Sequence, residues 1–172
     1  FLVLLVLNVT GAKAHELQAL RNHYTTSDGL ASNAIADIVE DRFGYIWIAT
    51  WNGLSRFDGY NFCNYPTGKN SGLSNFHNRI LTLTADNMGN IWMRMYDNRI
   101  FVLNRHTDVI ANAFESIEGG LLLKTNNGYQ GKTHRTTSTI VKSIDGYVYA
   151  YIRQKGIYRM RSVGAKPMVQ LV

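Results

Sequence analysis

The sequence contains one cysteine and two prolines among 172 residues. Cys63 has no second cysteine with which to form a disulfide, and a metal site built from several cysteines is excluded. The five histidines, at positions 15, 23, 77, 106 and 134, lack the close spacing of metal-binding pairs. The sequence therefore predicts neither a metal ion nor a cofactor.

Signatures of enzymatic chemistry are also missing. No Gly-x-Ser-x-Gly motif or comparable nucleophile motif occurs in the chain. The carboxylates are scattered, so no acid–base pair can be assigned from their spacing. We therefore assign no catalytic residue, and the lack of a recognition motif argues against nucleic acid as a partner.

The apolar runs are too short for a membrane span. Residues 1–7 read FLVLLVL, whereas about 20 apolar residues are needed to cross a bilayer. The triplet AKA at positions 12–14 has the small-x-small form that signal peptidase cuts. We interpret residues 1–14 as the tail of a secretory signal peptide whose basic start precedes Phe1, with a buried strand or a membrane anchor as alternatives. The mature chain then begins near His15.

The chain has a formal charge of +6, and acidic residues are scarce after position 120. Asp145 is the single acid there, against nine basic residues: Lys124, Lys132, Arg135, Lys142, Arg153, Lys155, Arg159, Arg161 and Lys166. Such a surplus attracts anionic ligands, for example acidic sugars. It is also typical of a solvated surface whose balancing acids lie elsewhere in a longer chain, and we favour this second interpretation.

Glycine and aromatic residues are abundant, with 15 Gly, 10 Tyr, 7 Phe and 3 Trp. Residues 44–62 read GYIWIATWNGLSRFDGYNF and hold two turn signals, NG at 52–53 and DG at 58–59. Because Asn and Gly both tolerate positive φ, the NG pair is expected as a two-residue hairpin turn. The sequence therefore predicts four short strands, at about 34–41, 45–50, 54–58 and 60–65.

The same arrangement recurs 45 residues later. Five residues return with this constant offset: Ile35, Asp41, Gly44, Ile46 and Trp47 recur as Ile80, Asp86, Gly89, Ile91 and Trp92. A weaker third copy at 140–149 keeps Gly146 and has Tyr149 in place of tryptophan. A period of about 40–50 residues that holds four strand-length segments is typical of β-propeller blades.

We therefore predict an all-β fold of β-propeller blades, each with four antiparallel strands. Residues 15–172 are divided into blades at about 24–66, 72–114 and 134–172, with 107–114 as the second outer strand and 115–133 as a loop or an extra hairpin. About three blades leave the ring incomplete, because a closed propeller needs at least about four. We expect the chain to be the N-terminal part of a longer propeller, with an exposed blade edge.

The repeated residues have structural roles in such a fold. Trp47 and Trp92 are expected as wedges between neighbouring blades, with stacking on a ligand as the alternative. The repeated glycines are expected at turn positions that need positive φ. Asp41 and Asp86 precede those turns and are expected to bond forward to the backbone, the alternative being a catalytic carboxylate.

The first copy resembles a known family, the two-component regulator propeller repeat. The residues that carry the resemblance are 29–33, 38–50 and 52–59. The family pattern is roughly GLxSNxVxxIxxDxxGxIWIGTxxGLxRFDG, and Ala49 departs from it where the pattern has glycine. The second copy keeps Asp-x-x-Gly-x-Ile-Trp but departs at 94–95 and 98–100. The resemblance covers about residues 24–105, with an echo to 160.

In that family such repeats form the periplasmic sensor of hybrid two-component systems. The resemblance implies a parent polypeptide with two seven-bladed propellers, a β-sandwich spacer, a membrane helix, a histidine kinase, a receiver and often a DNA-binding domain. The implied ligand is an oligosaccharide, whose sensing regulates polysaccharide-utilisation genes. The implied partners are the remaining blades and the downstream kinase of the same polypeptide, with a homodimer as a further option. This chain contains no phosphoacceptor-histidine motif and no nucleotide-binding glycine motif.

Ligand-binding residues are expected on one blade face, where the turn between strands two and three and the connection to the next blade both open. The candidates are Trp51, Asn52, Phe76, His77, Arg94, Tyr96, Asp97 and Arg153. Aromatic rings can stack on sugar rings, and placed polar groups can bond hydroxyls. Asn52, like Asn98, has turn geometry as its alternative role. Two other functions remain open: a propeller lyase or glycosidase, and a structural or protein-interaction propeller.

Overall fold

The structure is a computed structural model, and it describes residues 22–65, 78–114, 138–142, 145–153, 155–163 and 166–172. The predicted signal peptide tail at 1–14 and the loop or hairpin at 115–133 lie outside these residues. The described helical element is a single 3-10 turn, η1 (Thr26–Asp28). No helix within the described ranges is long and apolar enough to cross a membrane.

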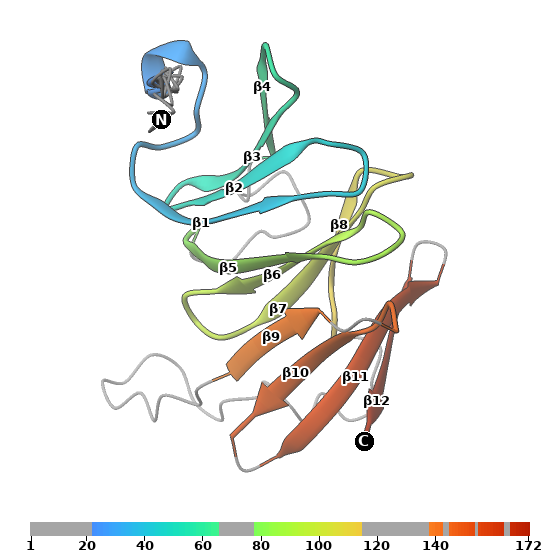
Figure 1. Cartoon of the computed structure of the whole chain (residues 1–172). Coiled ribbons are helices and arrows are strands. Elements are labelled where there is room, and N and C mark those ends of the chain that lie inside the picture. Colours follow the sequence, from blue (N-terminus) through green and yellow to red (C-terminus); the bar gives the residue numbers. More distant parts are fainter. Residues whose placement is uncertain (1–21, 66–77, 115–137, 143–144, 154, 164–165) are drawn as a thin grey trace, which may run out of the picture.

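Three four-stranded antiparallel sheets account for the strands of the described residues (Figure 1). The first sheet comprises β1 (Ile35–Glu40), β2 (Ile46–Thr50), β3 (Gly53–Phe57) and β4 (Phe62–Tyr65). The second comprises β5 (Ile80–Ala85), β6 (Ile91–Met95), β7 (Ile100–Asn104) and β8 (Val109–Asn112). The third comprises β9 (Ser138–Lys142), β10 (Val148–Ile152), β11 (Gly156–Val163) and β12 (Lys166–Leu171). In each sheet the strands are neighbours in chain order, so the prediction of all-β, four-stranded antiparallel blades is confirmed.

The sheets stack face to face, in an open arrangement and not in a closed ring (Figure 1). Their first strands lie next to one another, with β5 packed against β1 on one side and β9 on the other. The Leu83 N–H crosses the first gap and donates to the Asp37 carboxylate at 2.8 Å. The first strand of each sheet is therefore the inner strand of a blade, as a propeller requires.

Two buried tryptophans fill the gaps between the sheets. Trp47 is 1% exposed and packs in a cluster with residues of β5, β6 and β7 of the second sheet. Trp92 is fully buried and packs in a cluster with residues of β9, β10 and β11 of the third sheet. The two indoles occupy equivalent places, so the prediction that they are wedges between blades is confirmed.

Each wedge is held by a buried carboxylate. Asp41 accepts a hydrogen bond of 2.9 Å from Trp47 Nε1, and its other oxygen accepts from the backbone N–H groups two and four residues later, at 2.8 and 3.1 Å. Asp86 makes the same set of bonds, with Trp92 Nε1 at 3.0 Å. The forward backbone bonding predicted for both residues is confirmed, and the indole bond is an addition that the sequence did not indicate.

The loops that carry these carboxylates turn at the repeated glycines. Gly44, Gly89 and Gly146 have φ of 84°, 84° and 86°. This left-handed region strains any residue with a Cβ, so glycine is required there. The predicted positive φ is confirmed at all three positions.

The first hairpin turn differs from the prediction. Thr50 pairs with Gly53, so the turn is centred on Trp51 and Asn52 and not on Asn52 and Gly53. Gly53 has φ of 106°, whereas Asn52 has no positive φ. In this turn Gly53 takes the left-handed conformation, so the turn moves one residue back and places Trp51 at its tip.

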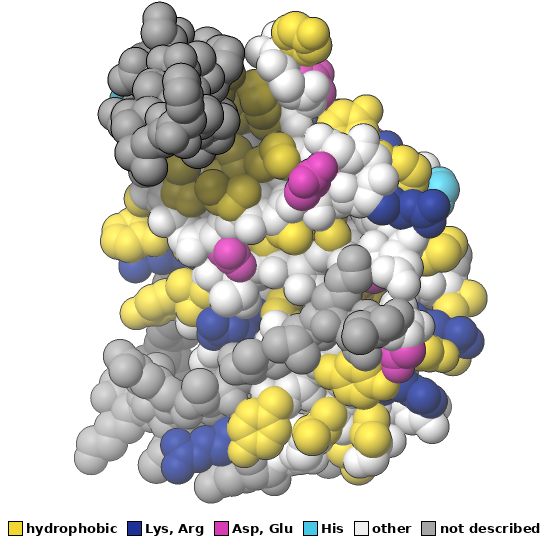
Figure 2. Space-filling model, in the orientation of Figure 1, with side chains coloured by type: hydrophobic (Ala, Val, Ile, Leu, Met, Phe, Trp, Pro, Cys, Tyr) yellow, Lys and Arg dark blue, Asp and Glu magenta, His cyan; other side chains and the backbone are white. Residues whose placement is uncertain are grey.

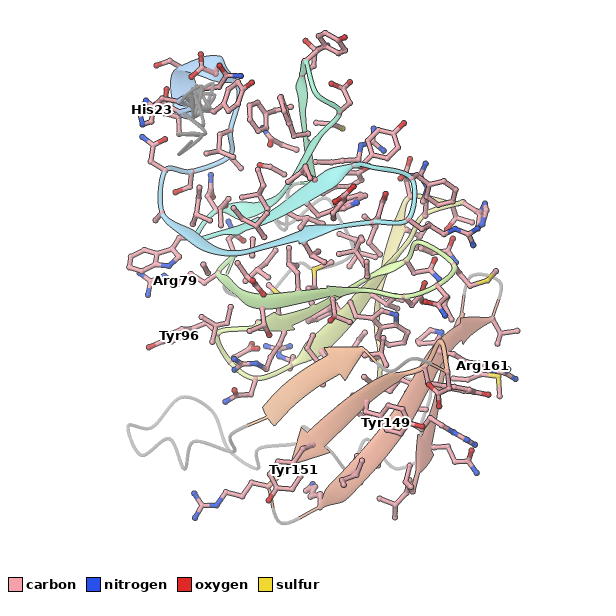
Figure 3. The ribbon with its side chains drawn as sticks, viewed as in Figure 1. His23, Arg79, Tyr96, Tyr149, Tyr151 and Arg161 are labelled. Carbon is pink, nitrogen blue, oxygen red and sulfur yellow. The ribbon has the colours of Figure 1, made fainter. Side chains whose placement is uncertain are left out.

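The third sheet departs from the pattern of the first two. Tyr149 stands at the wedge position, and its hydroxyl donates to Asp145 at 2.9 Å (Figure 3). This pair lies on an outer face that no described sheet covers. Tyr151, Ile157 and Met168 on that face are about half exposed. Tyr149 is partly exposed, unlike Trp47 and Trp92 at the equivalent positions of the first two sheets.

The far side of the first sheet is covered by the segment that precedes β1. The Tyr24 ring lies 4.9 Å from that of Phe57 and 5.5 Å from that of Phe62. Leu30, which belongs to the same segment, is buried. Cys63 is exposed on β4.

Replacing Asp41 by Ala is expected to destabilise the chain by at least about 2 kcal/mol, because the buried Trp47 N–H and two backbone N–H groups lose their acceptor. Asp145→Ala is the matched control, since its partners are exposed and turn to water at a cost within about 0.5 kcal/mol. Urea unfolding followed by circular dichroism measures both. Equal costs for the two substitutions contradict the role given to the buried carboxylate.

Tyr65 packs beside Trp47. Its ionisation makes the free energy of unfolding depend on pH in the alkaline range. Burial raises the pKa of Tyr65 from 10.0 to about 12, and the carboxylate of Asp108, 3.2 Å from the hydroxyl, adds to this rise. As the pH increases, the unfolded chain therefore loses this proton before the folded chain does. The contribution to stability is complete below about pH 10 and is lost as the pH rises from about 10 through about 12.

Tyr65→Phe should accordingly show a smaller fall in urea midpoint between about pH 9 and about pH 11 than the unsubstituted chain. Tyr60→Phe is the control, because Tyr60 is 89% exposed and the loss of its hydroxyl should leave the fall unchanged. Equal falls in the two variants exclude Tyr65 as the source of the alkaline effect.

Candidate functional site

The turns between the second and third strands of each sheet lie on one side of the stack, at the left of Figure 1. We call this side, formed by the β2–β3, β6–β7 and β10–β11 turns, the turn face. The loops between first and second strands lie on the opposite side. Of the eight predicted ligand residues, Phe76 and His77 lie outside the described residues, and the other six lie in or beside these turns.

The Asn78–Arg79 dipeptide joins the first two blades at the turn face. The carbonyl of Asn78 accepts from the Gly53 N–H in the first turn at 3.0 Å. The carbonyl of Arg79 accepts from the Tyr96 N–H in the second turn at 2.9 Å. Two consecutive carbonyls are thus bound to two different sheets, which fixes where the intervening side chain of Arg79 emerges.

The Arg79 side chain bridges the aromatic residues at the tips of these two turns. Its guanidinium carbon lies 3.9 Å from the ring centroid of Trp51 and 5.5 Å from that of Tyr96. The indole is 50% exposed and the phenol 52% exposed, so both present ring surface to solvent. Arg79 and Tyr96 extend from the sheets on the same side in Figure 3, and Figure 2 shows hydrophobic and basic side chains together at this edge.

The side chain of Asn52 fastens the first turn to its surroundings. Its Nδ2 donates to the carbonyl of Ala31 at 3.3 Å, and its Oδ1 accepts from Nδ2 of Asn78 at 3.3 Å. Both bonds involve segments that enter an inner strand. Asn52 is therefore more than a turn former, because it ties the turn to the segments that precede β1 and β5.

The predicted polar residues of the second turn are engaged within it. Nη1 of Arg94 donates to the side chain of Asn98 at 3.1 Å, and burial lowers the pKa of this guanidinium. Asn98 has φ of 67°, as the turn-geometry interpretation requires. The Asp97 carboxylate forms an ion pair of 2.7 Å with Arg99. These groups brace the turn that carries the exposed ring of Tyr96.

Arg153 occupies the β10–β11 turn and is exposed on the same side of the stack (Figure 1). Arg79 contacts the rings of Trp51 and Tyr96, which belong to the first two blades, whereas Arg153 belongs to the third. The structure therefore brings the first two blades together at one cluster and leaves the third blade as a separate contributor. Within the described ranges, no group of three or more His, Cys, Asp or Glu could hold a metal ion.

Sequence reasoning missed Arg79 and Asn78. Arg79 lies 45 residues after Ala34, and both residues make the equivalent backbone bond in their blades. The Ala34 carbonyl accepts from the Trp51 N–H at 3.0 Å, and the Arg79 carbonyl accepts from the Tyr96 N–H. The repeat offset therefore indicates where the backbone bond of Arg79 lies. It does not indicate that the Arg79 side chain contacts two aromatic rings, because these rings come from turns of different blades.

Comparison with known proteins relates part of the first blade to a family of repeats. Residues 29–52 match the sequence model of the two component regulator propeller. Over 50 residues, or 29% of the chain, the sequence is 36% identical to histidine kinase P4 of Formosa agariphila, and the match spans 4% of that protein. The chain therefore carries the two-component regulator propeller repeat.

Two solved structures have a similar arrangement of strands. The extracellular domain of the hybrid two component system BT3049 from B. thetaiotaomicron matches with a TM-score of 0.60 and 22% identity, over 86% of this chain and 19% of that one. Virginiamycin B lyase from Staphylococcus aureus matches with a TM-score of 0.49 and 14% identity, over 81% of this chain and 41% of that one, a likeness too low to carry an argument. The first match shows the fold and, with the repeat, identifies the three sheets as propeller blades.

Removing the Arg79 side chain is expected to make Trp51 more accessible to acrylamide, because the guanidinium covers one face of the indole. Trp47 and Trp92 are buried, so quenching of tryptophan fluorescence reports mainly on Trp51. Arg79→Ala should raise the quenching constant, and Trp51→Phe should remove the quenchable component.

Arg42→Ala serves as the control for this experiment. Arg42 lies on the opposite side of the stack, where it donates to the carbonyl of Asn87 at 2.7 Å. Its removal should leave the quenching unchanged. A quenching constant that responds equally to both substitutions contradicts the stacking of Arg79 on Trp51.

Proposed function

Because the chain carries the two-component regulator propeller repeat, we propose that it is an extracytoplasmic ligand-sensing part of a hybrid two-component signal transduction protein. The ligand is an oligosaccharide, and it binds at the turn face. One observation carries this proposal: Trp51 and Tyr96, from neighbouring blades, present half-exposed rings on either side of Arg79.

The cluster has the composition of a sugar site. One face of a pyranose ring is made of C–H groups, which pack on an aromatic ring, while its hydroxyls need donors and acceptors nearby. Trp51 and Tyr96 supply ring surface, and the Asn52 and Asp97 side chains lie in the same two turns.

The place of the chain in a signalling protein is part of the proposal. The chain spans 4% of the histidine kinase and 19% of the extracellular domain to which it is similar. We propose that it is exported by a signal peptide and works in the periplasm. Its partners are further blades and a histidine kinase of the same polypeptide, and its ligand controls polysaccharide-utilisation genes through that kinase. The residues of this chain act by binding and not by chemistry.

Thermal melting with a panel of oligosaccharides tests the function. A true ligand stabilises the folded chain by RT ln(1 + [L]/Kd), which is about 2.7 kcal/mol at a hundredfold excess over Kd. Trp51→Ala should abolish the shift in melting temperature. Tyr60→Ala should retain it, because that exposed ring lies in the β3–β4 turn, outside the proposed site.

Three other results are informative. Melting temperatures that no oligosaccharide changes favour a structural or protein-interaction propeller. Cleavage of an oligosaccharide during the assay favours a lyase or glycosidase. A shift that survives Trp51→Ala means that the ligand binds elsewhere on the chain.

A further inference from the structure

Arg79 has hydrogen-bond donors that the described residues do not use. Its side chain is partly exposed, stacks on Trp51 and lies near Tyr96, and makes no hydrogen bond or ion pair with any described residue. Stacking occupies the flat face of a guanidinium and leaves its N–H groups around the edge. The fixed backbone on both sides of Arg79 holds this edge in place before any ligand arrives.

From this arrangement we infer that the turn face takes an anionic oligosaccharide, whose carboxylate or sulfate group is bound by Arg79. This inference rests on the proposed function and specifies its ligand. A guanidinium binds a carboxylate or sulfate through two parallel N–H bonds, and a neutral sugar hydroxyl offers no comparable partner. The sugar ring that carries the acid group then lies against the exposed aromatic surface beside Arg79.

The charges around the cluster are arranged in favour of an anion. The acid of the second turn is Asp97, and its carboxylate forms the ion pair with Arg99 described above. Nε of Arg99 also donates a hydrogen bond of 2.8 Å to the same carboxylate. Arg153 adds an exposed positive charge at the third turn of the same face. Asp97 is thus engaged by Arg99, while the side chain of Arg79 has no ion-pair partner among the described residues.

The two aromatic rings explain why the cation is an arginine. A guanidinium stacks on an indole and still presents two coplanar donors, whereas an ammonium group offers a point charge without a fixed direction. If Arg79 served only to clamp the rings together, a lysine would retain much of the attraction and ligand charge would be irrelevant. If Arg79 binds the acid group, Arg79→Lys loses the paired geometry and keeps only the charge.

The inference is tested on a glycan array that carries neutral, uronate-bearing and sulfated oligosaccharides. The expected result is binding to acidic oligosaccharides, at least about tenfold tighter than to neutral ones and weaker at high salt. The tightest binder is then compared by calorimetry with its own charge-free derivative. For a uronate the derivative is the methyl ester, and for a sulfated sugar it is the desulfated form. Loss of binding in one or the other derivative shows whether Arg79 binds a carboxylate or a sulfate.

Three variants separate the role of Arg79 from general charge effects. Arg79→Gln should weaken binding of the acidic oligosaccharide by about tenfold or more and leave its charge-free derivative unaffected. Arg79→Lys should restore part of the loss. Arg42→Gln removes the same charge from the opposite side of the stack and should change the affinity by less than about twofold.

The outcomes distinguish this inference from the proposed function. Binding of neutral oligosaccharides as tight as that of acidic ones, or an affinity unchanged by Arg79→Gln, overturns the inference and leaves the sensor proposal standing. Absence of binding to every oligosaccharide overturns the proposed function and the inference with it. Unchanged melting temperatures of the free variants exclude misfolding as the cause of any loss.

Discussion

Two buried carboxylates determine how the blades of this protein pack. Asp41 and Asp86 each accept an indole N–H and two backbone N–H groups in a place where unpaired donors would be costly. The same side chain therefore sets the conformation of a loop and the position of the wedge that meets the next sheet. At the third sheet, Tyr149 bonds to the exposed Asp145 instead, on a face that no described sheet covers.

The site on the turn face is a product of this packing. The Trp47 wedge holds the first two sheets at one separation, and the Asn78–Arg79 dipeptide bonds to a turn of each. Only at that separation can one guanidinium contact both Trp51 and Tyr96. The turn face therefore owes its chemistry to residues of two blades, neither of which forms the cluster alone.

The sequence predicted those features that depend on local geometry. Strand positions, the positive φ of Gly44 and the wedge role of Trp47 follow from a constant offset and from steric requirements within one blade. The turn at Trp51 was placed one residue late, because the pair NG fits two registers and the strand pairing decides between them. Arg79 was missed because its partners belong to different blades, and no local pattern encodes a contact between separate turns.

The dipeptide that spans two blades has a mechanical consequence. Its two carbonyls are bound to neighbouring sheets, so a small rotation of one sheet against the other must move the Trp51 and Tyr96 rings apart or together. A molecule resting on both rings resists that rotation, and its affinity changes with the tilt between the sheets. Contact with both aromatic rings would therefore favour one tilt of the first two sheets, without any change in the fold of either blade.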